Sequence, residues 1–126
     1  MGWLENLVDH LKTSLSLTSD IFFETFDSTA PDCICFIHHP GIGNEQEAGT
    51  NTLHKAEFGI RIRNQDMETA ENQAKTLSDY LKLKSSFWAD TTWFKRITND
   101  NGFYHASTDA INGTIYSLNC YAEYEE

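Results

Sequence analysis

The sequence predicts one α+β domain in which two helices pack on one face of a mostly antiparallel sheet. Three observations support this fold class. Two segments repeat apolar residues at helical spacing, several short segments have strand-like composition or alternation, and turn sequences separate them. With 126 residues, the chain has room for a single core, so residues 1–126 are interpreted as one domain. The expected order of elements is α-β-β-β-α-β-β-β.

The two predicted helices are amphipathic. In residues 3–15, apolar side chains recur at every third or fourth position, and polar side chains occupy the other side. Residues 67–83 show the same spacing and follow Asp66, a favourable N-cap residue. The polar side of the first helix is not rich in Lys or Arg, so packing on a sheet is favoured over a membrane surface.

The strands are predicted from composition and alternation. Residues 21–26 and 33–38 are rich in β-branched and aromatic residues and form a hairpin or two neighbouring strands. Residues 40–51 are predicted to form a long polar surface loop. Residues 55–63 alternate cleanly, which indicates one buried face. The last three strands are expected at residues 92–98, 103–108 and 114–124, separated by turns.

The charge balance argues against several classes of function. Nine Lys and Arg oppose 19 Asp and Glu, which gives a formal net charge of −10. Proteins that hold a nucleic-acid backbone or an anionic membrane need clustered cations. No apolar run is long enough to span a bilayer, and residues 1–17 lack the basic start of a signal peptide. We therefore expect a cytoplasmic site of synthesis, where three cysteines stay reduced.

No sequence pattern indicates catalysis, and no cofactor is expected. Residues 41–43 lack the third glycine and the helix of a phosphate loop, and no nucleophile elbow occurs. Residues 33–39 hold two cysteines and two histidines, the side chains that zinc prefers. Alternation places Cys33, Cys35 and His39 on one strand face, but a fourth ligand is missing. Buried core cysteines are therefore favoured over a metal site.

Two features indicate contact surfaces. Arg61 and Arg63 lie two positions apart on one strand face, where pairing with carboxylates of a neighbour is favoured over phosphate binding. Residues 87–94 are dense in aromatic side chains. Alternation separates Trp93 from Phe94, which leaves one of them to cover a helix or to lie at a protein interface. The residues alone thus indicate a non-catalytic structural or interaction protein.

Four segments, which together cover nearly the whole chain, carry a resemblance to a known family. They are the amphipathic helix at 3–15, the strand at 30–36 that leads to Pro-Gly at 40–41, residues 58–71, and residues 99–104 followed by the strand at 116–124. In residues 58–71, aliphatic residues alternate with arginines and lead through an acidic turn into a helix. In this order and spacing, the segments resemble the tail terminators of long-tailed, non-contractile phages (siphophages), often called minor capsid proteins.

The resemblance implies a structural virion protein that forms a ring, usually of six subunits, at the head-proximal end of the tail tube. Such a ring stops further polymerisation of the tube and offers a surface for joining the head. The implied partners are further copies of this chain, the tail tube protein and head–tail connector or neck proteins. DNA passes through the lumen without specific binding, assembly takes place in the host cytoplasm, and no membrane partner is expected.

A closed ring of identical subunits needs two different contact faces on each copy. We expect the arginine pair on one face and the acidic loop on the other; loop carboxylates that faced the lumen would instead repel DNA. The candidate residues for contacts with subunits or tube are Arg61, Arg63, Glu45, Glu47, Phe103 and Tyr104. Three other functions stay open: a head-completion, neck or tail-tube protein, a small non-viral adaptor domain, and a zinc module.

Overall fold

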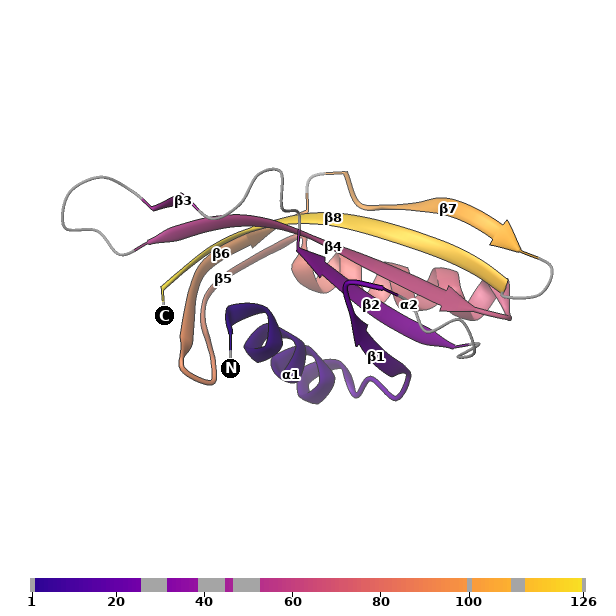
Figure 1. Ribbon diagram of the computed structural model, residues 1–126, viewed down its shortest axis with the longest axis horizontal. Coiled ribbons are helices and arrows are strands. Elements are labelled where there is room, and N and C mark those ends of the chain that lie inside the picture. The colour runs from indigo at the N-terminus through magenta and orange to yellow at the C-terminus, as the bar shows by residue number, and fades with distance from the viewer. Residues whose placement is uncertain are drawn as a thin grey trace.

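The computed structural model describes residues 2–25, 32–38, 45–46, 53–99, 101–109 and 113–125. In this part of the chain, two helices cover one face of a single, mostly antiparallel sheet (Figure 1), which confirms the expected fold class. The helices are α1 (Trp3–Leu15) and α2 (Met67–Leu81). The strands are β1 (Asp20–Phe23), β2 (Cys33–His38), β3 (Glu45–Gln46), β4 (His54–Asn64), β5 (Leu83–Ala89), β6 (Thr92–Thr98), β7 (Phe103–Asp109) and β8 (Gly113–Glu125).

The structure adds two strands to the expected set and changes two details. The short β3 pairs with β4, and β5 pairs with β6 in a hairpin. Helix α2 ends at Leu81 rather than at residue 83, because Leu83 already belongs to β5. Strand β1 is a neighbour of β2, as one of the two alternatives had it, but the two strands run parallel and so form no hairpin.

Helix α2 begins where the sequence predicts. The side chain of Asp66 accepts a hydrogen bond from the backbone N–H of Thr69 at 3.2 Å, which satisfies one of the free donors of the first turn. The Thr69 hydroxyl also donates to this carboxylate, and these hydrogen bonds lower the pKa of Asp66. Asp66 is thereby confirmed as the N-cap.

Strands β4 and β8 form the centre of the sheet. Their antiparallel pairing runs from His54 opposite Tyr124 to Asn64 opposite Thr114. At one end of this pair the strand order is β1-β2-β4-β8-β7, and at the other end it is β3-β4-β8-β6-β5. Strands β6 and β7 therefore lie in line along the same edge of β8, which Figure 1 shows as β7 continuing beyond β6.

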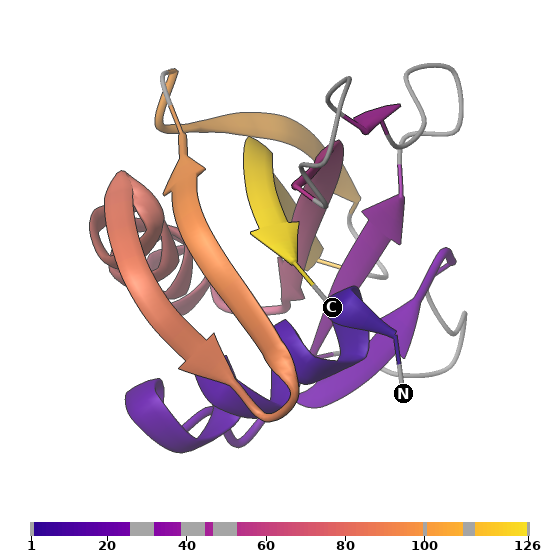
Figure 2. The ribbon, with the colours of Figure 1, turned by 90° about the vertical axis from the view of Figure 1, so that its left-hand side faces the viewer.

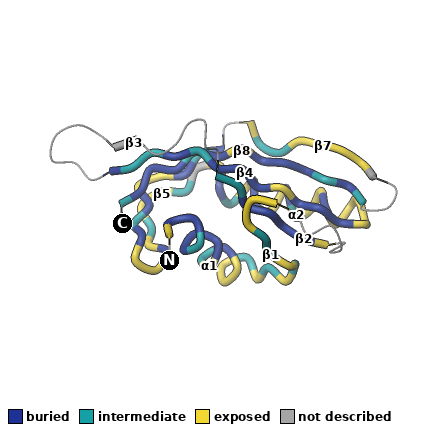
Figure 3. Tube along the Cα trace, in the orientation of Figure 1, coloured by how far each residue is buried: buried dark blue, intermediate teal, exposed yellow. Residues whose placement is uncertain are grey.

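The core lies between the helices and the sheet face that they cover. Figure 3 colours buried residues dark blue. They include much of β4 and β8 and residues of both helices. The apolar side chains of the core come from every large element, and the fully buried ones of greatest volume are Tyr124, Phe36, Phe58, Phe94, Leu4, Leu7, Leu11, Ile34, Ile60, Ile62, Leu77 and Leu81. The even-numbered positions of β4 and β8 thus face the helices, and the odd-numbered positions face away.

Trp3, in the first turn of α1, packs against the sheet and holds this helix in place. Its ring stacks on Tyr124 with centroids 4.8 Å apart and meets Phe58 and Phe94 edge-on at 5.7 and 6.4 Å. The side chain is 5% exposed. Figure 2 shows the result: the sheet curves around the side where α1 lies, and the first and last described residues are near each other.

His10 links α1 to α2 and β5. Its Nε2 lies 2.8 Å from the hydroxyl of Tyr80, and its ring lies against Phe87 with centroids 4.8 Å apart. Lys84 lies over the rings of both Tyr80 and Phe87. Burial, with a smaller contribution from the Lys84 charge, lowers the pKa of His10. His10 is thus held neutral in the fold.

This environment predicts a loss of stability on mild acidification. Between the lowered folded-state pKa and the usual value of about 6.5, the unfolded chain binds a proton that the folded chain does not, so stability rises with pH through this window. The free energy of unfolding from urea titrations should fall as the pH is lowered from 7.5 to 5.5. In the His10→Gln variant, the same series should be flatter; an equally steep dependence would contradict the role of His10.

Candidate functional site

The sheet face opposite the helices, here called the helix-free face, carries three of the predicted contact residues. Arg61 on β4 lies opposite Cys35 of β2 and Ser117 of β8, and Ser117 lies opposite Tyr104 of β7. Arg61 and Tyr104 therefore share one row across the sheet. Arg63 projects from the same face two residues further along β4, as the sequence predicts.

The two arginines differ in environment. Arg61 is exposed, whereas the side chain of Arg63 is 5% exposed and takes part in the packing of the face. Among the residues that the structure describes, no carboxylate forms an ion pair with Arg61. Arg61 is therefore a solvent-exposed cation in the middle of a sheet face, available to a carboxylate of another molecule.

The other candidate residues lie elsewhere. Phe103 points to the helix side, where its ring meets Tyr116 edge-on at 5.8 Å. Glu45 belongs to β3 and pairs with Lys55, six residues along β4 from Arg61 and thus about 20 Å away. Glu47 falls outside the described residues. The structure thus gathers Arg61, Arg63 and Tyr104 on one face but does not bring Glu45 to them.

Charge is distributed unevenly between the two sides of the molecule. On strands β4, β6 and β8, the helix-free face carries five of the nine Lys and Arg of the chain. These cations are Lys55, Arg61, Arg63, Lys95 and Arg96. The carboxylates on the same part of the face are Glu57, Glu123 and Glu125. The helices carry more acidic than basic residues, with Glu5, Asp9, Glu68, Glu71 and Asp79 against Lys12 and Lys75. The strongly negative net charge of the chain therefore does not describe this face.

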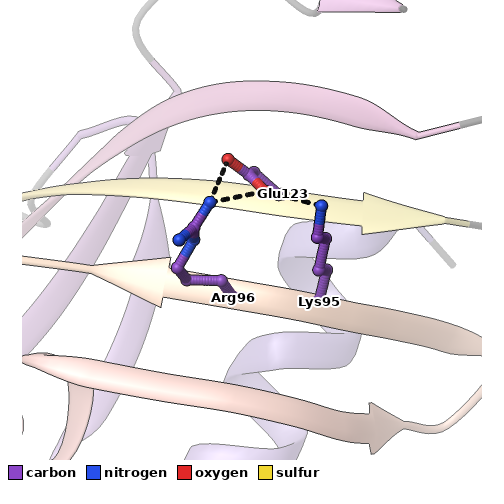
Figure 4. A network of polar contacts seen from close by, with 3 residues as sticks. All are labelled: Lys95, Arg96 and Glu123. Atoms are coloured by element: carbon purple, nitrogen blue, oxygen red, sulfur yellow. Dashed lines mark hydrogen bonds and ion pairs between the residues drawn. The ribbon is translucent and has the colours of Figure 1, made fainter.

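Glu123 neutralises part of the positive charge at the β5 end of the face (Figure 4). Both of its carboxylate oxygens accept from Arg96 Nη2, at 3.1 and 3.2 Å, and Lys95 Nζ lies 3.9 Å away. Glu123 is 7% exposed, whereas both cations remain accessible to solvent. This cluster ties β6 to β8 across the face. Arg61 lies beyond it, towards the β7 end of the sheet.

The aromatic pair at the β5–β6 turn is a second exposed feature of the helix-free face. The predicted separation of Trp93 from Phe94 is confirmed: Phe94 is fully buried in the core, and Trp93 lies on the other side. Trp93 pairs across the hairpin with Trp88, which is 66% exposed. Trp88 belongs to the strand that sequence reasoning missed, so its position beside Trp93 was not predicted.

The cysteine and histidine cluster is divided between the two sides of the sheet. Cys33 and Cys35 are fully buried on the helix-free side, whereas His38 meets Trp3 on the helix side, with ring centroids 5.6 Å apart. Burial raises the pKa of Cys35 to about 11 despite the nearby charge of Arg61. His39 lies outside the described residues. No group of three His, Cys, Asp or Glu suited to a metal ion occurs among the described ones.

The described surface has several open hollows. One on the helix-free face has a volume of about 230 Å³ and is lined by Glu57, Thr98, Asn119 and Tyr121, among others. It lies where the partner of β8 changes from β6 to β7. Cys120 also contributes to the lining, and burial raises the pKa of its thiol to about 12. The other lining residues offer hydrogen-bond donors and acceptors and one carboxylate.

In the part of the chain that the structure describes, a charged sheet face and exposed aromatic side chains are features typical of a structural or interaction protein. Residues 10–126 match the family model described as bacteriophage tail terminator protein. The chain therefore belongs to the phage tail terminator family and is a structural component of the virion tail, as the resemblance implied. A comparison with curated proteins gives no match. None of the described helices has the length and apolar character needed to cross a membrane.

Proposed function

We propose that this chain assembles into a ring, expected to hold six copies, on the head-proximal end of the tail tube. The ring stops polymerisation of the tube and presents the surface on which the connector or neck proteins join the head. The observation that carries this proposal is the family match over residues 10–126, nearly the whole chain. Assembly takes place in the host cytoplasm before the tail joins the head.

The size and charge of the molecule suit such a ring. A chain of this length has a diameter of about 35 Å, and six such bodies in a ring leave a central hole of about the same width. DNA passes through this hole without specific binding. Each copy also has two unlike sides, since acidic residues predominate on the helices and more than half of the cations lie on the helix-free face.

The test of the function is negative-stain imaging of this protein mixed with the purified tail tube protein of its phage. Short tubes of uniform length, each closed at one end by a ring, are expected. Unrestricted tubes without bound rings would overturn the proposal and favour a neck protein. Tubes built from this chain alone would identify a tail tube subunit instead.

Charge reversal at Arg61 is expected to weaken ring assembly about tenfold or more, because an interfacial carboxylate that pairs with this cation would then be repelled. Sedimentation velocity of Arg61→Glu and the lengths of tubes grown in its presence measure the effect. Lys75→Glu, an equal charge change on the exposed side of α2, is the matched control. Normal rings and normal tube lengths with Arg61→Glu would exclude Arg61 from the contact.

A further inference from the structure

The β7 end of the sheet has two free edges. There the strand order is β1-β2-β4-β8-β7, and within the described residues β1 pairs only with β2 and β7 only with β8. Figure 1 shows β7 lying along the outside of β8 at this end of the molecule. The two edges lie on opposite sides of the same five strands. Such a half-sheet can be extended from either side.

The free edge of β7 lacks the side chains that usually block edge pairing. Residues Tyr104 to Thr108 are all exposed and include no Lys, Arg, Glu or Pro, and an irregularity between His105 and Ser107 is the only interruption. The edge strand β5 at the other end differs, since it carries Lys84 and a left-handed residue, Ser86, with a φ of 54°. An open edge of this kind on β7 is suited to pairing with another chain.

We infer that β7 of one subunit pairs with β1 of the next subunit in the ring, so that one sheet continues from copy to copy. The inference rests on the proposed ring. Strand directions support it. Because β7 and β4 both run antiparallel to β8, they point the same way, whereas β1 and β2 point the opposite way. In a ring whose axis follows the strands, β7 therefore meets β1 antiparallel, the more stable arrangement.

The side chains on the two edges also match. On the helix-free face, one row across the five strands consists of Phe22, Cys35, Arg61, Ser117 and Tyr104. The adjacent row on the helix side consists of Phe23, Phe36, Ile60, Leu118 and Phe103. Each row ends in an aromatic residue at both edges. A junction without stagger would place Tyr104 beside Phe22 and Phe103 beside Phe23, and a shift by two residues would keep each face intact.

The exposed aromatic side chains on β1 and β7 also support pairing between these two edges. Phe23 is 39% exposed and Tyr104 is 49% exposed, and these are two of the four large apolar side chains that the described surface leaves open. In the unstaggered register, the proposed junction covers both and forms cross-strand aromatic contacts on both faces of the sheet. These two exposed aromatic groups, one from each subunit, are thus removed from water at each contact.

The width of the half-sheet agrees with a ring that DNA can traverse. Five strands spaced about 4.8 Å apart span about 24 Å per subunit, so six copies close a circle of about 144 Å. The backbone diameter is then about 46 Å, and any tilt of the strands enlarges it. Side chains that point inward would reduce this opening but leave room for a duplex.

Cysteine pairs placed across the junction test it. Tyr104→Cys/Phe22→Cys probes the unstaggered register, and Tyr104→Cys/Asp20→Cys probes a shift of two residues, since Asp20 lies on the same face of β1. Opposed residues in antiparallel strands approach closely enough for a disulfide. The natural thiols interfere little because all three are buried, and burial raises the pKa of Cys120 to about 12.

Rings formed on tail tubes are oxidised with copper phenanthroline and separated without reductant. One of the two pairs should give a ladder of covalent multimers up to the size of the ring. The matched control is Tyr104→Cys/Ser85→Cys, because Ser85 is exposed on the helix-free face of the other free edge strand, β5. This control should stay monomeric, and thermal unfolding should show each variant folded.

The outcomes separate the junction from the function. Rings that cap tubes but show no ladder with either β1 variant, or that cross-link through Ser85→Cys instead, overturn the junction and leave the terminator function standing. Cysteine variants that are folded yet, like the unmodified chain, neither form rings nor limit tube length overturn the proposed function and the junction with it.

Discussion

Replacing Trp3 by alanine should lower the free energy of unfolding by about 3–5 kcal/mol, as for other large buried aromatic side chains. The indole lies between Phe58, Phe94 and Tyr124, each on a different strand, so its removal opens a cavity where α1 meets the sheet. Urea unfolding followed by circular dichroism measures the loss.

Trp88→Ala is the matched control for this experiment. It removes the same side chain from a position that is 66% exposed and outside the core, so a loss below about 1 kcal/mol is expected. A similar loss in the free energy of unfolding in the two variants would show that the stabilisation by Trp3 does not depend on its packing between α1 and the sheet.

Gly113→Ala should cost about 3 kcal/mol or more. Gly113 has a φ of 90°, and a Cβ there would lie 2.3 Å from the backbone oxygen of Asn64 and 2.7 Å from its carbonyl carbon. The added methyl group thus has two costs. The backbone is strained because φ is positive, and the methyl group clashes with backbone atoms, which cannot move away as a flexible side chain can. Because Gly113 opens β8, the largest strand of the sheet would have to shift relative to β4.

Gly102→Ala separates these two causes. Gly102 also has a positive φ, of 70°, but its nearest neighbour, the hydroxyl of Ser78, is 3.8 Å from the added carbon. Only the conformational cost of about 1–2 kcal/mol is expected there. Denaturant midpoints of the two variants give the comparison, and equal losses would mean that the contact with Asn64 is relieved by movement.

The elements that the sequence predicted best are those with strong local patterns. The alternation of β4 and the spacing and N-cap of α2 depend on residues close in sequence, and the structure confirms both. Strand β5 was missed because Lys84, Ser85 and the left-handed Ser86 interrupt any alternation. Its pairing with β6 outweighs this weak local preference.

The arrangement of the candidate site depends on information that a single segment lacks. That Arg61 and Arg63 share a face follows from their spacing. Tyr104 joins their face only because β8 sets the register of both β4 and β7. In the same way, the two open edges become evident only when the strand order is known. Side-chain periodicity predicts which residues of one strand share a face, but it does not predict which strands lie next to each other in the sheet.

The stacking of Trp3 on Tyr124 has a consequence for the synthesis of the protein. Residues at the two ends of the chain share the core, and the central strands β4 and β8 are separated by α2 and three further strands. The core therefore cannot close before β8 is synthesised, and β8 follows every other described element along the chain. Folding of this topology is dominated by contacts distant in sequence and should be slow. Chains in which β8 is not yet synthesised lack the strand with which β7 pairs, so they would not present the β7 edge of the proposed junction.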